Sequence, residues 1–305
     1  VLVLSLGCEN NQPDAFMELL GDYDKDRIKL LITQKVEGDE LEEGMKILRK
    51  LYAQAKEDKR TDVPVSKLRI GLKCGGSDGF SGITANPLVG ELSDWLVAQG
   101  GTTVLTEVPE MFGAETILMN RCKTRELFDQ TVSMINNFKE YFLSHGEPVG
   151  ENPSPGNKAG GISTLEDKAL GCTQKCGKGP VSGVMEYGER LHNDGLNLLS
   201  APGNDLVAAT ALASCGCQLV TFTTGRGTPF GTFVPTMKIS TNNDLAARKP
   251  NWIDFNAGQL LLGKDMKSVR DAFIDKVIAV ASGEKARNEI NGYSEIAIFK
   301  NGVTL

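Results

Sequence analysis

Four glycine-rich loops carry most of the side chains that could bind a small polar ligand. They are GCENN (7–11), KCGGSDGFSG (73–82), PGNKAGG with GCTQK (155–161 and 171–175), and APGNDL with TTGRGTPFGT (201–206 and 223–232). Glycine lets the backbone approach a ligand and offers N–H groups to anions. Lysine and arginine bind carboxylates, and the hydroxyl and amide side chains match hydroxyl groups. The set indicates a small polyhydroxylated acid, although a plain tight turn stays open for any single loop.

The seven cysteines form no pattern typical of a secreted disulfide framework, which indicates reduced thiols in a cytoplasm. Cys8, Cys74 and Cys172 lie at strand ends or in polar loops, where a metal ligand or a reactive thiolate could be placed. A four-thiolate zinc site from the pairs at 172/176 and 215/217 is an alternative, but its spacing is a poor match. Cys215 and Cys217 are therefore predicted to be core residues.

Nucleotide motifs and histidine-based sites are not favoured. GCTQKCGKG (171–179) has Cys176 where a phosphate loop needs glycine, and GRGTPFG (225–231) lacks the glycine spacing of the dinucleotide fingerprint. His145 and His192 lie outside the four loops and are predicted to be surface residues. A Ser-His-Asp triad or a three-histidine metal site is therefore not expected.

The composition is that of a soluble globular protein. Of 305 residues, 40% are hydrophobic and 24% are charged, and the net charge of -6 argues against nucleic-acid binding. The longest apolar runs, such as residues 1–6, are strand-sized and far shorter than the roughly 20 residues of a membrane helix. No signal peptide is recognised, so no membrane partner and a cytoplasmic location are predicted. Because residues 1–6 already read as a strand, a truncated or proteolysed chain is expected.

Strands and helices alternate through the first half. Strands are predicted at 1–6, 27–33, 68–74 and 102–108, and helices at 13–20, 40–55, 87–99 and 124–143. In the second half, strands are predicted at 196–202, 217–224 and 295–299, and helices at 205–213 and 266–281. This order predicts an α/β fold, two α/β domains with mostly parallel sheets.

A stretch rich in proline and glycine, residues 145–161, is interpreted as an interdomain linker. It predicts one domain at 1–150 and a second, catalytic domain at 151–305. Because ligands bind at the carboxyl ends of parallel strands, the four loops are expected to converge at the interface of these domains.

Long segments of the chain resemble the altronate/galactarate dehydratase family. They are KCGGSDGFSGITANPLVG (73–90), SPGNKAGGISTLEDKALGCTQK (154–175), LLSAPGNDLVAATALASCGCQLVTFTTGRGTPFGTFVPTMKISTN (198–242) and WIDFNAG (252–258), with LGCENNQ (6–12) similar to a family turn. The match covers essentially the whole chain, and sulfolactate sulfo-lyase large subunits share the same motifs. Cys176 departs from an expected glycine, and Cys122 and Cys215 from small residues, so these three thiols are not predicted to be functional.

The resemblance implies a hydro-lyase that removes water from a sugar acid to give a 2-keto-3-deoxy acid. It implies a divalent metal, Fe²⁺ or alternatively Mn²⁺, for which Cys74 and Cys172 are the predicted ligands. It also implies a small N-terminal domain that this chain lacks, and residues 1–150 would be the C-terminal part of the family's middle domain. A homo-oligomer is left open, and the sugar acid itself is not identified.

Within these segments, Lys158 and Lys175 are candidates for a catalytic base, because a lysine with a depressed pKa can accept a proton. Asp78 and Asp205 are further catalytic candidates. A solvated surface charge remains the alternative for each lysine. The candidate substrate-binding residues are Lys73, Ser77, Asn86, Asn157, Thr173, Gln174, Asn204, Arg226, Thr228 and Lys238.

Arg226 is expected to hold a substrate carboxylate, with an ion pair to Asp205 that braces the loop as the alternative. Two other functions stay open at this point. One is the carbon–sulfur lyase reaction of the sulfolactate relatives, and the other is an inactive fragment that binds a sugar acid.

Overall fold

The computed structural model describes residues 1–300, which form two compact units divided between Val63 and Pro64. In the smaller unit, two parallel strands pair in register from Leu2↔Lys29 to Ser5↔Ile32. Its elements are β1 (Leu2–Ser5), α1 (Pro13–Leu20), β2 (Lys29–Ile32), η1 (Thr33–Lys35) and α2 (Glu40–Ala55). Helix α2 begins where the Asp39 side chain accepts hydrogen bonds from two backbone N–H groups of its first turn.

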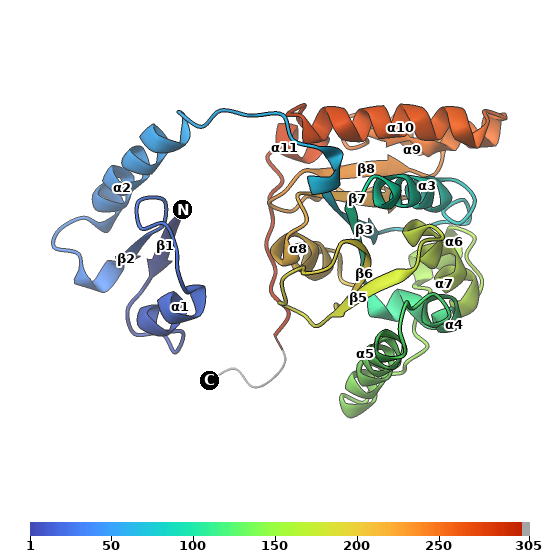
Figure 1. Ribbon diagram of the computed structural model, residues 1–305, viewed down its shortest axis with the longest axis horizontal. Coiled ribbons are helices and arrows are strands. Elements are labelled where there is room, and N and C mark those ends of the chain that lie inside the picture. The colour runs from blue at the N-terminus through green and yellow to red at the C-terminus, as the bar shows by residue number, and fades with distance from the viewer. Residues whose placement is uncertain (301–305) are drawn as a thin grey trace. The chain divides into compact units, whose positions relative to one another are not determined.

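A seven-stranded sheet forms the centre of the larger unit, in the order β5-β6-β4-β3-β7-β8-β9 (Figure 1). Every neighbouring pair of strands in it is parallel. The α/β fold class with a mostly parallel sheet is thereby confirmed. The strands are β3 (Arg69–Cys74), β4 (Thr102–Leu105), β5 (Val181–Met185), β6 (Gly195–Leu199), β7 (Leu219–Thr224), β8 (Thr236–Ser240) and β9 (Phe255–Asn256).

Helices cover both faces of this sheet. α3 packs against β4 and β7, whereas α8 packs against β3 and β7, and Figure 1 shows the two helices on opposite sides of the strands. The helices of this unit are α3 (Ala85–Ala98), α4 (Glu115–Met119), α5 (Arg125–Ser144), α6 (Pro155–Ala159), α7 (Leu165–Thr173), α8 (Asp205–Cys215), α9 (Asn243–Arg248), α10 (Met266–Ala281) and α11 (Arg287–Asn291). The short 3-10 turns are η2 (Val65–Lys67), η3 (Val108–Met111), η4 (Gln174–Cys176) and η5 (Ala257–Leu262).

Successive side chains of β3 point to opposite faces of the seven-stranded sheet. A Cβ at Gly71 would lie 2.9 Å from Leu212 of α8, so this position faces α8 closely enough to require glycine. Because side chains alternate along a strand, Lys73 points to the α8 side and reaches Asp205 at its first turn, while Cys74 points to the opposite side. The end of β3 therefore supplies functional groups to both faces of the sheet.

The expected boundary near residue 150 does not separate two folded units. β3 and β4 pair directly with β7 and β6 of the second half, in register Ile70↔Leu219 and Thr102↔Gly195. Residues 145–161 consequently lie within the larger unit, where part of the stretch forms α6. The boundary lies instead between Val63 and Pro64, where the chain divides into its two compact units.

The local pattern also differed from the structure at a few elements. Residues 295–299 form no strand, because their backbone N–H groups bond to the Gly231 carbonyl and to the hydroxyls of Thr210 and Tyr187. The strands β5 and β8 and the helix α7 were missed by the sequence reading. In the described part of the chain, no helix combines the length and apolar character needed to cross a membrane.

Candidate active site

The candidate site lies where the strand order reverses. The next strand in the chain after β3 is β4, which lies on one side of β3 in the sheet. β7, which comes later in the chain, lies on the other side. Loops leave such a point in opposite directions and open a crevice at the carboxyl ends of the strands. Here the backbone N–H groups of Gly225 and Arg226 donate to the Gly76 carbonyl at 3.0 and 3.1 Å. These bonds join the loops that follow β3 and β7.

A Cys–Glu cluster, formed by Cys74, Glu110 and Cys172, lies at the centre of the site. Cys74 ends β3, Glu110 belongs to η3 after β4, and Cys172 lies in the last turn of α7. The two Sγ atoms are 3.5 Å apart, and Cys172 Sγ lies 3.3 Å from Glu110 Oε2. All three side chains are buried, and their ligand atoms lie within 4.8 Å of one another.

The donor atoms of this cluster fit a divalent transition metal. Thiolates suit iron and zinc, and a carboxylate oxygen suits Mn²⁺. Three protein donors leave further coordination positions open, which is the arrangement of catalytic rather than structural sites. The structure thus adds Glu110 to the two ligands expected from the sequence.

A network of buried charges surrounds the cluster. Lys73 Nζ donates to Glu107 Oε1 and, at 2.8 Å, to Asp205 Oδ1. Glu107 Oε2 accepts from the backbone N–H of Cys74 at 3.0 Å and lies 3.6 Å from Lys175 Nζ. Lys168 Nζ lies 3.0 Å from Glu110 Oε1. Each buried cation is thus matched by a carboxylate.

The buried lysines of this network remain protonated. Burial opposes the charged form, but attraction to Glu107 and Asp205 raises the pKa of Lys73. Burial is likewise outweighed at Lys168 by Glu110, and at Lys175 by Cys74, Cys172 and Glu107, so the pKa of both lysines is raised. The expectation of a depressed pKa at Lys175 is therefore wrong, because the neighbouring groups are anionic.

The two thiols of the cluster share one hydrogen bond. It lowers the pKa of Cys74 and raises the pKa of Cys172 well above its usual value. Lys175 favours the charged form of both thiols, whereas burial disfavours it. Of the two thiols, Cys74 therefore has the lower pKa.

Glu107 has an unusual backbone. Its φ of 68° makes it the non-glycine residue with positive φ within residues 1–300. Such a conformation costs about 1–3 kcal/mol, and residues that adopt it cluster at functional sites. The left-handed turn directs the buried carboxylate to Lys73 and to the backbone of Cys74. Sequence reading missed Glu107 and Glu110, although an acid near the end of the predicted strand 102–108 and another just after it were an available signal.

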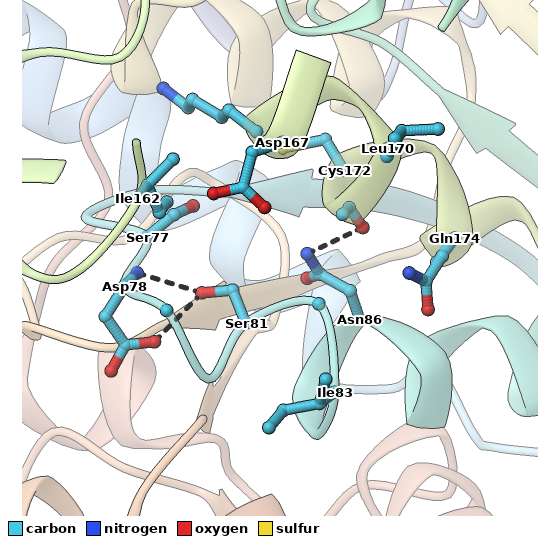
Figure 2. A pocket seen from close by; sticks show the side chains of 14 residues that line it. Ser77, Asp78, Ser81, Ile83, Asn86, Ile162, Asp167, Leu170, Cys172 and Gln174 are labelled. Atoms are coloured by element: carbon cyan, nitrogen blue, oxygen red, sulfur yellow. Dashed lines mark hydrogen bonds between the residues drawn. The ribbon is translucent and has the colours of Figure 1, made fainter. Parts of the chain in front are cut away.

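Two cavities border the Cys–Glu cluster. The larger, about 430 Å³, is lined by Cys74, Glu107, Glu110, Lys168, Asp205 and Arg226 among others. The smaller, about 190 Å³, is lined by Cys172 and by the loop that follows β3 (Figure 2). Ser77 and Lys168 border both cavities. The cluster therefore faces one cavity through Cys74 and the other through Cys172.

The structure brings many of the predicted site residues to these cavities. The larger cavity is lined by Cys74, Ser77, Asn157, Asp205 and Arg226. The smaller is lined by Ser77, Asp78, Asn86, Cys172 and Gln174. Lys73 and Lys175 lie behind the walls as part of the charge network. Three of the four glycine-rich loops thus converge within the larger unit, and GCENN (7–11) belongs to the smaller unit.

Other predicted site residues lie outside both cavity walls. Lys158 is exposed on α6, and Thr228 is half-buried. Thr173 Oγ1 donates to carbonyls of its own helix, and Asn204 caps α8 by accepting from Leu206 and Val207. His145 and His192 are exposed, and Cys215 and Cys217 are buried in the core, as predicted.

Asp78 is held by neutral hydrogen bonds. Its carboxylate accepts from Ser81 Oγ, Thr241 Oγ1 and Asn242 Nδ2 at 3.1, 2.9 and 3.0 Å (Figure 2 shows the first). A Cβ at Gly225 would lie 2.1 Å from this carboxylate, so glycine is required there. These contacts support a role for Asp78 in joining the loops after β3, β7 and β8.

Lys238 is also removed from the cavities. Its side chain is buried, and Nζ donates to the Phe230 carbonyl. Burial lowers its pKa to about 8, against the partial opposition of Asp254 and Glu295. The expected contact of Lys238 with substrate is therefore not supported, because the ammonium points into the protein interior.

Lys238→Met is expected to stabilise the protein at pH 7. The unfolded chain binds a proton at Lys238 below pH 10.5 and the folded chain only below about 8, so folding stability rises with pH across that window. The shift corresponds to roughly 3 kcal/mol, and the lost hydrogen bond offsets about 1 kcal/mol, leaving a gain of about 2 kcal/mol. Urea unfolding between pH 7 and 10.5 would measure both effects.

The exposed Lys267 provides the matched control, since Lys267→Met should leave the stability and its pH dependence unchanged. Two results would contradict a lowered pKa at Lys238. One is a Lys238→Met variant that is less stable than the wild type at pH 7, and the other is a variant whose stability still rises with pH by the wild-type amount.

Fold and site together define a class of protein. It is a parallel α/β protein with a candidate divalent-metal centre at the switch point of its sheet. The D-galactarate/altronate dehydratase C-terminal family model matches residues 65–304, and the D-galactarate dehydratase/altronate hydrolase second-domain model matches residues 1–56. The chain belongs to the D-galactarate/altronate dehydratase family. The two matches follow the two units of the structure, so the second domain ends well before residue 150.

Curated relatives agree with this assignment. The chain is 62% identical over 307 residues to altronate dehydratase of Bacillus subtilis (strain 168), covering 100% of this chain and 61% of that protein. It is 33% identical to galactarate dehydratase (L-threo-forming) of Escherichia coli (strain K12), covering 98% of the chain and 59% of that protein. It is 31% identical to the (2R)-sulfolactate sulfo-lyase subunit beta of Chromohalobacter salexigens, covering 82% and 66%.

Proposed function

We propose that the protein is a metal-dependent hydro-lyase that dehydrates a sugar acid of the altronate or galactarate class to a 2-keto-3-deoxy acid. The observation that carries the proposal is the Cys–Glu cluster beside a cavity of about 430 Å³ lined by both carboxylates and cations. The printed names of the relatives support the same reaction class. The chain spans 61% of the length of the first of these relatives, so the activity is proposed for the complete protein.

The reaction needs a positive charge near the substrate carboxylate and a base near the proton that is removed. Removing a proton beside a carboxylate builds negative charge on its oxygens, and a divalent ion held by Cys74, Glu110 and Cys172, Fe²⁺ or Mn²⁺, would supply positive charge for it. Lys168 adds a permanent cation on the same wall, paired with Glu110 and hydrogen-bonded to Asn157. The substrate carboxylate is proposed to bind on this side of the cavity.

Asp205 is the proposed base. One carboxylate oxygen is held at 2.8 Å by Lys73, and the partly exposed side chain lines the larger cavity. Hydrogen bonding fixes its position, as a base acting on a C–H bond requires. Lys175 and Lys158, the bases expected from the sequence, fit less well, because Lys175 is held protonated and Lys158 lies outside the cavity walls.

The same proposal covers the setting of the enzyme. A cytoplasmic location is supported by the free state of all seven cysteines. The relatives are longer than this chain, and the family's N-terminal domain is the proposed partner of the part described here.

The decisive experiment assays the full-length protein against a panel of aldonic and aldaric acids and sulfolactate, with Fe²⁺ or Mn²⁺ added. Formation of a 2-keto acid from one sugar acid, followed by NMR, is the expected result. Sulfite release from sulfolactate without dehydration of any sugar acid would replace the proposed reaction with carbon–sulfur cleavage. Binding without turnover would leave only the sugar-acid-binding alternative.

Arg226→Lys is expected to weaken catalysis with little effect on folding. The exposed guanidinium lies on the wall of the larger cavity and donates to the Gly156 carbonyl at 3.4 Å, while Asp205 pairs with Lys73. Its planar guanidinium is therefore available to a carboxylate. Its loss should lower transition-state stabilisation, measured from the ratio of kcat/KM values, by about 1–3 kcal/mol. Arg248→Lys, at another exposed position, is the control. A lower Tm of Arg226→Lys with unchanged kcat/KM per folded molecule would show instead that Arg226 stabilises its loop.

A further inference from the structure

Two buried thiols of the Cys–Glu cluster are close enough to react with each other. Cys74 Sγ and Cys172 Sγ lie 3.5 Å apart, and both residues carry free thiols. A disulfide requires about 2.05 Å, so closure needs a movement of about 1.5 Å. Cys74 is followed by Gly75 and Gly76, and Cys172 lies at the end of α7, so both thiols stand where their elements end. We propose that Cys74 and Cys172 form a reversible disulfide in the metal-free protein when a small peroxide is present.

Both thiols are within reach of a small oxidant although they are buried. Cys74 borders the larger cavity of about 430 Å³, and Cys172 borders the smaller of about 190 Å³ (Figure 2). Each volume holds several molecules of the size of water or hydrogen peroxide. The small volume beside Cys172 favours a small oxidant. The proposal therefore names peroxide as the oxidant.

The chemistry balances in two steps. Cys74 attacks one peroxide oxygen, which cleaves the O–O bond and yields a sulfenic acid and one water. Cys172 then attacks the Cys74 sulfur, forming the S–S bond and releasing the sulfenic oxygen as a second water. Glu110 Oε2 accepts the hydrogen bond of the Cys172 thiol at 3.3 Å and can take its proton during that attack. Overall, two thiols lose two electrons and two protons, and one peroxide becomes two waters.

The disulfide would control loading of the metal, a consequence that rests on the proposed function. It consumes two of the three donor atoms of the cluster, which leaves Glu110 alone. A metal already bound there would occupy both sulfurs and prevent the oxidation. Reduction by a dithiol restores the donors. The site is thereby sensitive to peroxide only while it is metal-free.

The test maps the disulfide in the full-length protein after removal of metal with a chelator. The protein receives hydrogen peroxide, free thiols are alkylated, and trypsin is added without reductant. Cleavage after Lys73, Arg121, Lys168 and Lys175 places Cys74 in peptide 74–121 and Cys172 in peptide 169–175, each with a single cysteine. The expected product is these two peptides joined, with their alkylated forms lost. Recovery of both peptides alkylated, at a dose that oxidises the exposed Cys8, overturns the proposal.

A second arm repeats the oxidation with Mn²⁺ bound, because ferrous iron would itself consume peroxide. The joined peptide should fall at least tenfold in yield, and dithiothreitol should restore Mn²⁺ binding to the oxidised protein. Equal yields of the joined peptide with and without Mn²⁺ would support the disulfide but contradict metal binding at the Cys–Glu cluster. The two proposals can therefore fail separately.

Variants test the order of the steps. Cys172→Ser leaves Cys74 without a resolving thiol, so dimedone-labelled Cys74 should replace the joined peptide. Cys215→Ala removes a buried thiol of the pair at 3.9 Å from Cys217 and should leave the joined peptide unchanged. A Cys172→Ser protein in which peptide 74–121 gains neither dimedone nor a partner would overturn the assignment of Cys74 as the first thiol oxidised.

Discussion

Cys74→Ala is expected to lose the divalent metal proposed for the Cys–Glu cluster and to fall more than about 100-fold in kcat/KM, since even partners that only orient a ligand are worth about 10–100-fold. The substitution removes one of the three donor atoms of the Cys–Glu cluster. The remaining Cys172 thiol would also lose the hydrogen bond that it shares with Cys74. Elemental analysis after gel filtration, with kcat/KM on the best acid of the panel, measures both effects.

The matched control for this variant is Cys217→Ala. Cys217 is 2% exposed and Cys74 is 3% exposed, so both substitutions remove a buried thiol, but Cys217 lies in the core beneath α8. Metal content should stay at the wild-type level in the control. Unchanged metal content and activity in Cys74→Ala would remove this residue from the proposed metal site.

Lys73→Met is expected to destabilise the protein by about 3–5 kcal/mol, because it breaks a buried ion pair from one side. Lys73 is fully buried between Glu107, which is 1% exposed, and Asp205. After the substitution, Glu107 keeps Lys175 at 3.6 Å and the backbone N–H of Cys74 as partners. Chemical denaturation followed by circular dichroism measures the loss, and activity should fall as well because Asp205 is released.

Two comparisons separate this effect from the loss of a long side chain. Arg125→Met breaks a surface pair with Asp129, at 3.0 Å with both side chains more than half exposed, and should cost less than about 1 kcal/mol. Adding Glu107→Gln to Lys73→Met removes the orphaned charge and should restore part of the stability. If the double variant were less stable than Lys73→Met alone, the ion pair would not be the cause.

Local sequence patterns placed most of the regular elements. Helices predicted at 40–55 and 266–281 have the bounds of α2 and α10, since an apolar face at helical spacing and a capping Asp39 or Asp265 act within one element. β5 was missed because Pro180 and Gly183 weaken its pattern. β8 was missed because a proline-rich loop hides its start, and because the buried Lys238 interrupts its apolar run.

The amino-acid sequence by itself determined the α/β class, the family and which loops carry polar groups, because these depend on residue type and on spacing within short segments. Only the tertiary structure decided that β3 and β4 share a sheet with β6 and β7, which removes the boundary near residue 150. It also decided which polar residues meet. Cys74 and Cys172 are 98 residues apart in the chain, and Lys73 and Asp205 are 132 apart.

The same physical reason explains the residues that sequence reading assigned differently. The charge state of a lysine depends on its neighbours in space, so Lys175 beside two thiols and Glu107 has a raised pKa. Lys238 has a lowered pKa, because burial outweighs the attraction of Asp254 and Glu295. Glu107 and Glu110 become site residues only through the left-handed turn that follows β4. No local pattern encodes these distances, because strand pairing across the sheet brings the groups together.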